Sequence, residues 1–256
     1  MHERTPVNGL RGAIQFLTRV PIRLPTEVGH ARVVPWFGVV GVLIGAAVGG
    51  TAAGLSHIVP TAVAATCAIV VGLLITGAFH EDGLADIADA FGGGWSVERR
   101  LEILKDSRHG TYGVVALSSS IVVRVVSAAS ITAPSAAFAA FVAAHGLGRV
   151  SAVAAMKAAS SATDGGLGVS AASSLRPAPT IAGMAVATGG AAVVCGWWIL
   201  PFLGASVVGT AAVVVLAVRK IGGLAGDVLG AVEQVVECLV LVVATGLAAR
   251  HPVWWA

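Results

Sequence analysis

The chain has 256 residues, of which 56% are hydrophobic and only 11% are charged, and its mean hydropathy is +0.88. Soluble domains carry about 25% charged residues, so this composition excludes a soluble globular protein and predicts an all-α, polytopic integral membrane protein. The three cysteines, Cys67, Cys195 and Cys238, lie in separate apolar stretches without metal-ligand or disulfide spacing, and we expect them to be small packing residues.

The predicted elements begin with a cytoplasmic N-terminal segment, 1–32, which contains a short amphipathic helix at 10–20 on the membrane surface. About seven transmembrane helices follow, because seven apolar segments are long enough to cross a bilayer. They lie at 33–56, 62–79, 113–133, 135–156, 180–200, 202–218 and 229–249. We expect them to form one membrane-embedded domain over 1–256, with its active-site loops on the cytoplasmic side.

Basic residues are distributed unevenly between the loops. If the N-terminus is cytoplasmic, thirteen of the 16 Lys and Arg residues fall on the cytoplasmic side, and only Arg250 falls outside. The positive-inside rule therefore predicts this orientation, with the acidic and glycine-rich loops facing the cytoplasm. The pI of about 9.1 follows from the same topology, and we expect no nucleic-acid partner.

Four carboxylates follow the second apolar segment. Asp82, Asp86 and Asp89 are spaced i, i+4 and i+7, so a helix places them on one face. Neighbouring carboxylates repel one another unless a cation lies between them, and Mg²⁺ binds such oxygen ligands together with substrate phosphates. We expect these aspartates to be catalytic metal ligands, with Glu81 as a further ligand or a partner of the ligands, and Gly83 to admit a bulky ligand. A charged run is usually a solvated loop, but this regular spacing favours a site.

A second polar segment, 105–113, carries cations, hydroxyls and glycines that suit phosphate binding. Its Lys and Arg can neutralise a diphosphate while the hydroxyls donate hydrogen bonds. An interfacial anchor with Tyr112 among the lipid headgroups is compatible with the same residues. Together with a histidine before the aspartates and an aspartate before the last span, the candidate substrate-binding residues are His80, Lys105, Asp106, Ser107, Arg108, Thr111 and Asp227.

Two stripes of glycines have a spacing of four residues. The first has no charge nearby, which predicts close packing between helices; it consists of Gly41, Gly45 and Gly49. The second lies beside Asp227, and its face either packs against a helix or admits a large ligand; it consists of Gly222, Gly226 and Gly230. Asp227 stands at a membrane entry and needs a partner, which makes it a candidate site residue.

Four charged residues lie inside predicted spans. Glu233 and Glu237 enter the last span on one helical face, and each buried charge costs about 2.5–3.5 kcal/mol. Arg124 and Arg149 are the available intramembrane cations. We therefore expect the two arginines to pair with the glutamates or with a phosphate.

Three stretches read FHEDGLADIADAFGGG at 79–94, RRLEILKDSRHGTYGVVAL at 99–117 and GGLAGDVLGAVEQVVE at 222–237. Together with AIQFLTRVPI at 13–22, they closely resemble the adenosylcobinamide-GDP ribazoletransferase family, also called cobalamin 5′-phosphate synthase, over nearly the whole chain. The chain departs from the family pattern at Ala225, where the family has Thr, and at Thr163, where a basic residue is expected. Each departure bears on one substrate contact and not on the reaction.

This resemblance implies the last joining step in assembly of the cobalamin nucleotide loop, in the inner membrane of a prokaryote. The hydroxyl of α-ribazole, or of its 5′-phosphate, would attack the cobinamide-linked phosphate of adenosylcobinamide-GDP and expel GMP. The implied cofactor is Mg²⁺ on the aspartates, with Asp89 the preferred base for the hydroxyl proton. The implied partners are the two small-molecule substrates and membrane lipid, and both a monomer and a homo-oligomer stay open.

Two other functions fit part of the pattern. A CDP-alcohol phosphotransferase also pairs an aspartate-rich helix with a nucleotide diphosphate, but its Asp-Gly-x-x-Ala-Arg signature is absent, because residues 82–87 read DGLADI. A divalent-cation transporter would hold its carboxylates at the bilayer midplane, whereas this cluster is predicted at one membrane face. The sequence therefore favours the transferase.

Overall fold

The computed structural model describes residues 6–24, 28–106, 108–162 and 172–256, and within these ranges the chain forms helices and no β-strand. The all-α class predicted from the sequence is confirmed. The helices are α1 (Pro6–Leu17), α2 (His30–Val33), the 3₁₀ turn η2 (Val34–Trp36), α3 (Phe37–Leu55), α4 (Thr61–Thr76), α5 (Phe79–Gly93), α6 (Val97–Ile103), α7 (Thr111–Ser130), α8 (Pro134–Ala155), α10 (Pro177–Cys195), the 3₁₀ turn η3 (Gly196–Trp198), α11 (Ile199–Ile221) and α12 (Gly226–Ala248).

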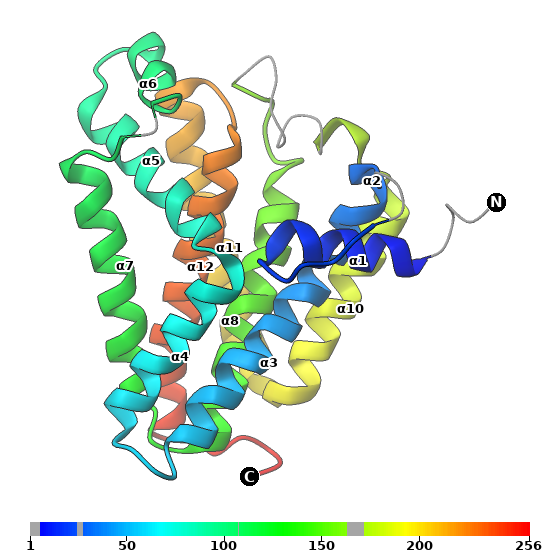
Figure 1. Cartoon of the computed structure of the whole chain (residues 1–256), viewed down its shortest axis with the longest axis vertical. Helices are drawn as coiled ribbons and strands as arrows, with labels where there is room; N and C mark the ends of the chain where they lie inside the picture. Colours follow the sequence, from blue (N-terminus) through cyan, green and yellow to red (C-terminus); the bar gives the residue numbers. More distant parts are fainter. Residues whose placement is uncertain (1–5, 25–27, 107, 163–171) are drawn as a thin grey trace.

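The long helices run side by side, and α8 is the central one, in contact with α3, α10, α11 and α12 (Figure 1). Alanine and glycine make up much of α8, so neighbouring backbones approach it closely. A Cβ atom on Gly45 would lie 2.5 Å from the carbonyl oxygen of Phe141, and one on Gly49 would lie 2.9 Å from that of Phe138. The packing role predicted for the first glycine stripe is therefore confirmed.

The number of membrane spans differs from the prediction. Five helical stretches are long and apolar enough to cross a membrane, or six if α4 and α5 count as one broken span. The predicted number of seven is not confirmed, because α4 has only 16 residues and Pro177–Ile221 counts as one stretch. That stretch contains two helices, since η3 separates α10 from α11 and the chain reverses direction there (Figure 1). The polytopic class itself holds.

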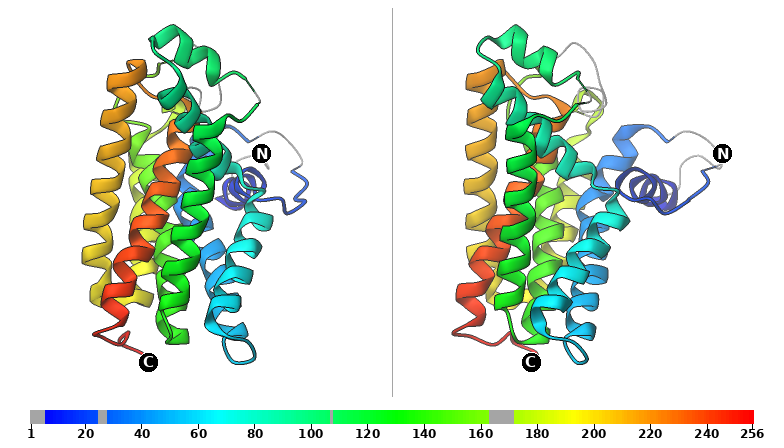
Figure 2. Two further views of the ribbon diagram at one scale, coloured as in Figure 1. Left: turned by 90° about the vertical axis from the view of Figure 1, so that its left-hand side faces the viewer. Right: turned by 60° about the vertical axis from the view of Figure 1, so that its left-hand side comes forward.

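The N-terminal helix α1 lies across the side of the bundle, at an angle to the long helices (Figure 2). Its inner face is buried at Ala13 and Leu17, whereas Val7 is exposed. The predicted amphipathic helix therefore exists, but it spans Pro6–Leu17 rather than 10–20. It ends before Thr18, whose hydroxyl donates to the carbonyl oxygen of Ile14 at 2.7 Å.

A sharp bend joins α4 to α5. The two helices are inclined at 90°, and both linking residues have left-handed backbone angles, with φ of 67° at Gly77 and 56° at Ala78. A left-handed alanine is unfavourable, by roughly 1–2 kcal/mol, so the surrounding packing imposes the bend. As a result α5 does not continue the line of α4 but crosses toward the end of the bundle that carries α6 (Figure 1).

Candidate active site

Two predicted aspartates on α5 meet a histidine from the loop before α7. The Nε2 atom of His109 lies 3.5 Å from Oδ1 of Asp82, and its Nδ1 atom lies 3.5 Å from Oδ1 of Asp86. Asp82 and His109 are exposed and Asp86 is partly buried, so the group is open to a ligand. One ligand atom from each residue lies within 4.8 Å of the others, which is close enough for a shared metal ion. The structure thus brings Asp82 and Asp86 together as predicted.

Asp89 has a different environment from the other two aspartates. Its Oδ2 atom accepts a hydrogen bond from the backbone N–H of Gly110 at 2.6 Å, and its Oδ1 atom accepts one from Gly113 at 2.9 Å. A Cβ atom on Gly110 would lie 2.6 Å from the same carboxylate, so glycine is needed for this close approach. Asp89 is buried against the first turn of α7, and it does not belong to the group formed by Asp82, Asp86 and His109. It anchors the segment that carries His109.

The start of α12 reaches the same region through a close helix crossing. A Cβ atom on Gly83 would lie 2.9 Å from the carbonyl oxygen of Asp227, and one on Gly230 would lie 3.1 Å from that of His80. Asp227 is partly buried in the first turn of α12, within electrostatic reach of Asp82 and Asp86. The predicted candidate Asp227 is therefore a neighbour of the acidic group.

The second glycine stripe does not form one helix face. Gly222 ends α11 with a left-handed φ of 78°, and α12 begins only at Gly226. Only Gly230 packs closely against another helix, α5, since a Cβ atom on Gly222 or Gly226 would meet nothing within 4 Å. The expectation of one smooth face formed by all three glycines was wrong because the chain turns between the first and second of them.

The predicted phosphate-binding loop contains a local ion pair. Arg108 donates from Nε to Oδ1 of Asp106 at 2.9 Å and from Nη2 to Oδ2 at 2.6 Å. These hydrogen bonds from the Arg108 side chain lower the pKa of Asp106 to about 2. Lys105 and Thr111 are exposed on either side of the pair, and Ser107 lies outside the described residues. The loop therefore presents an exposed ammonium, an exposed hydroxyl and a guanidinium that already has a partner.

Glu81 and His80 point into the bundle rather than toward Asp82 and Asp86. Glu81 is buried and accepts hydrogen bonds from Nη1 of Arg124 at 2.9 Å and from Nε2 of Gln234 at 3.2 Å. His80 is buried as well, with its Nδ1 atom 3.4 Å from Nη2 of Arg149. Successive residues of a helix are rotated by about 100°, which separates these two side chains from the exposed aspartate face.

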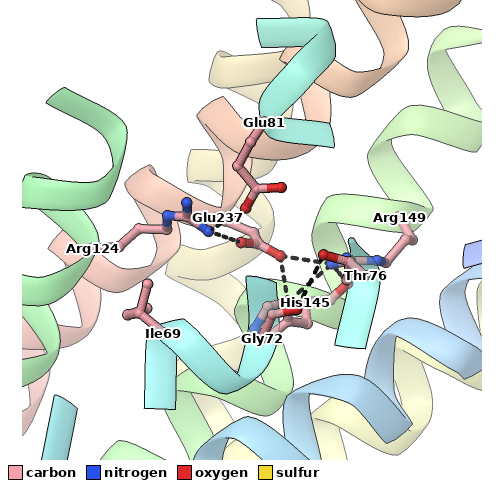
Figure 3. A pocket seen from close by; sticks show the side chains of 8 residues that line it. All are labelled: Ile69, Gly72, Thr76, Glu81, Arg124, His145, Arg149 and Glu237. Carbon is pink, nitrogen blue, oxygen red and sulfur yellow. Dashed lines mark hydrogen bonds and ion pairs between the residues drawn. The ribbon is translucent and has the colours of Figure 1, made fainter. Parts of the chain in front are cut away.

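Glu81 belongs to a larger buried charge network (Figure 3), and His80 adjoins the same network through Arg149. Arg149 donates to Glu237 at 2.6 Å and forms a further ion pair with Glu233, and Arg124 donates to Glu237 at 3.2 Å. The expected pairing of the arginines with the two glutamates of the last span is confirmed. A small cavity of about 10 Å³, room for about one water molecule, lies among Glu81, the arginines and Glu237.

A second group of metal-ligand type lies in this network. His145, Glu233 and Glu237 each offer a ligand atom within 4.8 Å of the others, and all three are buried. However, Nη1 of Arg149 donates to both glutamates and contacts the ring nitrogen of His145. The guanidinium already occupies the place of a cation, so this group is better described as an ion-pair cluster.

Sequence reasoning missed His109, which completes the exposed group. The residue is the only imidazole in the 105–113 segment, but nothing in its spacing from the aspartates predicted the contact. Of the two family departures, Thr163 lies outside the described residues, and Ala225 is the N-cap residue of α12. No side chain caps that helix, and Ala225 instead lines a cavity of about 30 Å³ together with Leu224 and Leu229.

Comparisons with known proteins all point to one family. The family model described as cobalamin-5-phosphate synthase matches residues 9–245. An adenosylcobinamide-GDP ribazoletransferase of Bradyrhizobium diazoefficiens is 38% identical over 252 residues, which cover 94% of this chain and 94% of that protein. One of Ralstonia nicotianae is 36% identical over 247 residues, with 90% and 91% covered.

The matched region is not of equal extent in every relative. An adenosylcobinamide-GDP ribazoletransferase of Shewanella frigidimarina is 41% identical over 143 residues, which cover 54% of this chain and 55% of that protein. No solved structure matches the chain. The family model and the two relatives matched over nine-tenths of their length nevertheless agree, and the chain belongs to the cobalamin-5-phosphate synthase family.

Proposed function

We propose that this enzyme joins α-ribazole, or its 5′-phosphate, to adenosylcobinamide-GDP with release of GMP, and that the reaction requires Mg²⁺. Relatives matched over nine-tenths of the chain carry the name adenosylcobinamide-GDP ribazoletransferase, which names adenosylcobinamide-GDP and ribazole, the two molecules that the proposed reaction joins. The observation that carries the proposal is the exposed group of Asp82, Asp86 and His109, with Asp227 beside it. Its open face suits a ligand as large as a nucleotide diphosphate.

The donor set fits a magnesium ion. Mg²⁺ in phosphoryl-transfer enzymes is bound through one or two carboxylates, with substrate phosphates and water completing its shell. Asp82 and Asp86 supply two carboxylates on successive turns of α5, and both have room on the solvent side. When bound, Mg²⁺ would neutralise charge on the diphosphate and on the departing GMP. Glu81 already pairs with Arg124, and Asp89 already accepts hydrogen bonds from backbone amides. Both carboxylates are therefore better suited to positioning the site than to binding the metal ion.

The loop before α7 supplies the cationic side of the site. The exposed Lys105 ammonium can reach a phosphate oxygen, and Arg108 can exchange its bonds to Asp106 for bonds to a phosphate. Thr111 and Ser107 are the candidate hydroxyl donors, and Asp227 is a candidate for orienting the second substrate. Phosphoryl transfer depends mainly on such positioning and charge neutralisation, because the protein does little covalent chemistry.

In the reaction, the ribazole hydroxyl oxygen forms a bond to the phosphorus attached to cobinamide. The bond from that phosphorus to the bridging oxygen breaks, and GMP leaves with the bridging oxygen. The hydroxyl proton passes to a base of the protein. We propose His109 for this part, because its imidazole is exposed between the two carboxylates, whereas both oxygens of Asp89 accept backbone hydrogen bonds.

The orientation of the enzyme follows from its charge distribution. We propose that the α6 end of the bundle faces the cytoplasm of a prokaryotic cell, since the positive-inside rule favours that side for the basic loops. Exposed apolar side chains along α7, α10 and α11 would then face lipid of the inner membrane. Water-soluble nucleotide substrates would reach the acidic group from the cytoplasm.

The test is release of GMP from adenosylcobinamide-GDP by the detergent-purified protein. We expect release to require α-ribazole and Mg²⁺, to stop with EDTA, and to fall at least about a hundredfold in Asp82→Asn. Glu102→Gln is the matched control, because Glu102 is an equally exposed carboxylate on α6 that pairs with Arg99 and lies outside the acidic group. Release that is independent of metal, or equal in the two variants, would overturn the proposal. Transfer from CDP-linked donors, or ion uptake into vesicles, would support the rival functions instead.

A further inference from the structure

We propose that Arg124 is a positioning residue: through Glu81 it holds α5 against α7 so that Asp82, Asp86 and His109 stay within ligand distance of one another. The inference rests on the metal-dependent function proposed above. It concerns a side chain on α7 that touches none of the three residues of the acidic group. Arg124 is 3% exposed, inside the bundle.

Besides their packing, the helices α5 and α7 are joined by side-chain hydrogen bonds at two points within the described residues. At one point the carboxylate of Asp89 accepts hydrogen bonds from the first turn of α7 and the residue before it. At the other point Nη1 of Arg124 donates to Oε1 of Glu81 at 2.9 Å. Asp82 and Asp86 lie between these two points along α5. Their position relative to α7 is therefore fixed from both sides.

The same fastening determines where His109 lies. His109 directly precedes Gly110, the residue that bonds to Asp89, so it moves with the N-terminus of α7. A slide or rotation of α5 against α7 would change both 3.5 Å distances from the imidazole to the aspartates. The hydrogen bonds to Asp89 hold α5 to α7 at one end of the segment that carries the two aspartates. Arg124 supplies the second anchor.

Arg124 also links this pair of helices to α12. The same Nη1 atom donates to Oε2 of Glu237 at 3.2 Å, so one guanidinium joins α7 to α5 and α12 (Figure 3). α12 in turn crosses α5 at Gly83 and carries Asp227 beside the acidic group. A planar guanidinium with several donors can bond to two carboxylates at fixed angles, which a lysine ammonium does less well.

We assign a positioning role, rather than a stabilising one, to the contact between Arg124 and Glu81 because burying these charges costs free energy. Charges inside a membrane bundle are expensive, and a buried ion pair gives little net stability compared with apolar residues of similar size. What such a pair does give is a directional contact between specified atoms. The contact between Arg124 and Glu81 is of this kind, since one Nη1 atom and one Oε1 atom form it.

The test measures Mn²⁺ binding by electron paramagnetic resonance, with Mn²⁺ as the only added ligand. We expect Arg124→Gln to weaken Mn²⁺ binding roughly tenfold or more, as for outer residues that orient metal ligands, and Arg124→Lys to lie between it and the wild type. In the GMP-release assay the half-saturating Mg²⁺ concentration should rise by a similar factor, while kcat at saturating Mg²⁺ recovers. A merely structural role would lower the amount of active protein without this split.

Two controls keep the outcomes separate. Gly45→Ala loosens the contact between α3 and α8, neither of which carries a residue of the acidic group, and should lower stability without changing Mn²⁺ affinity. If Arg124→Gln does not yield folded protein, the Mn²⁺ affinity of Arg124→Lys is compared with that of the wild type instead. A folded Arg124 variant with wild-type Mn²⁺ affinity overturns this inference alone. A wild type whose Mn²⁺ signal is absent, or insensitive to Asp82→Asn, overturns the proposed metal site as well.

Discussion

At the residue scale, Asp82 and Asp89 carry the same functional group in two environments. The Asp82 side chain is 64% exposed and lies beside His109, whereas Asp89 is buried and accepts two backbone hydrogen bonds. One carboxylate is therefore available to a ligand, and the other is part of the framework. Substitution with asparagine separates the two roles, because it removes the charge and turns one oxygen into a donor.

We expect Asp89→Asn to lower the free energy of unfolding by about 1–3 kcal/mol, since its amide group would oppose a backbone N–H. Activity should fall with it, because His109 depends on the same turn. Asp82→Asn should leave stability within about 0.5 kcal/mol of the wild type while activity is lost. Thermal unfolding in detergent, followed beside GMP release, checks both. Equal stability of the two variants would contradict this assignment.

Ala225 offers a second residue-scale prediction. It is the N-cap of α12, in extended conformation and without a side-chain hydrogen bond, and the sequence resemblance leads us to expect Thr there. We expect Ala225→Thr to raise the free energy of unfolding by about 0.5–2 kcal/mol, because the hydroxyl can accept from a backbone N–H of the first turn. Catalytic turnover should stay unchanged. Ala225→Val adds the same bulk without the hydroxyl, so an equal gain in that variant would refute the capping explanation.

The limits of sequence reasoning are clearest at these residues. Helical periodicity correctly predicted that Asp82 and Asp86 share a face, because both lie on one continuous helix. It also put Asp89 on that face, but the N-terminus of α7 covers this end of α5, and local spacing contains no information about such docking. The contact of His109 with the aspartates could not be predicted for the same reason, since it forms only because α7 packs back against α5.

At the scale of elements, the close crossings depend on glycine. Gly45 of α3 meets the backbone of α8 at Phe141, whereas a Cβ atom on Gly50 would meet nothing within 4 Å. The stripe was predictable because its glycines are all inside one helix. The stripe near the last span was not, because Gly222 ends α11 and the spacing of four continues across a turn. Regular spacing is informative only within one element.

This difference gives a matched pair of variants on one helix. We expect Gly45→Ala to lower the free energy of unfolding by about 1–3 kcal/mol, because the added methyl group forces α3 away from α8. Gly50→Ala should leave stability unchanged or slightly raise it, as alanine is the better helix former. Unfolding curves in detergent or lipid nanodiscs compare the two. A similar effect of both substitutions would argue against close backbone packing at Gly45.

At the scale of the whole molecule, the candidate site and the C-terminus lie at opposite ends of the bundle (Figure 1). The site end carries most of the loops with basic residues, and the other end carries the exposed Arg250. Apolar run lengths predicted the helices well, since every predicted apolar segment overlaps a helix. They could not predict the bend at Gly77 and Ala78, which depends on the packing around α5.

Orientation can be tested with single cysteines in a chain whose three native cysteines are replaced. We expect Glu98→Cys on α6 to react with a membrane-impermeant maleimide only in inside-out vesicles, and Arg250→Cys only in intact cells, because both side chains are exposed at opposite ends. GMP release at the wild-type rate in both variants would verify that the labelled protein is native. The reversed labelling pattern would place the candidate site outside the cell and exclude the proposed topology.

The buried charge network has a consequence for how the chain is made. The cations Arg124 and Arg149 stand on α7 and α8, which leave the ribosome long before α12 with its two glutamates. Until α12 is made, Arg149 lacks both of its glutamate partners and Arg124 lacks Glu237, although Glu81 of α5 is already present. α12 alone would carry two carboxylates into lipid at about 2.5–3.5 kcal/mol each. Partnering with the earlier helices removes both penalties together. We therefore expect insertion of the last helix to be the committed step of biogenesis, and chains released before it to be recognised and degraded.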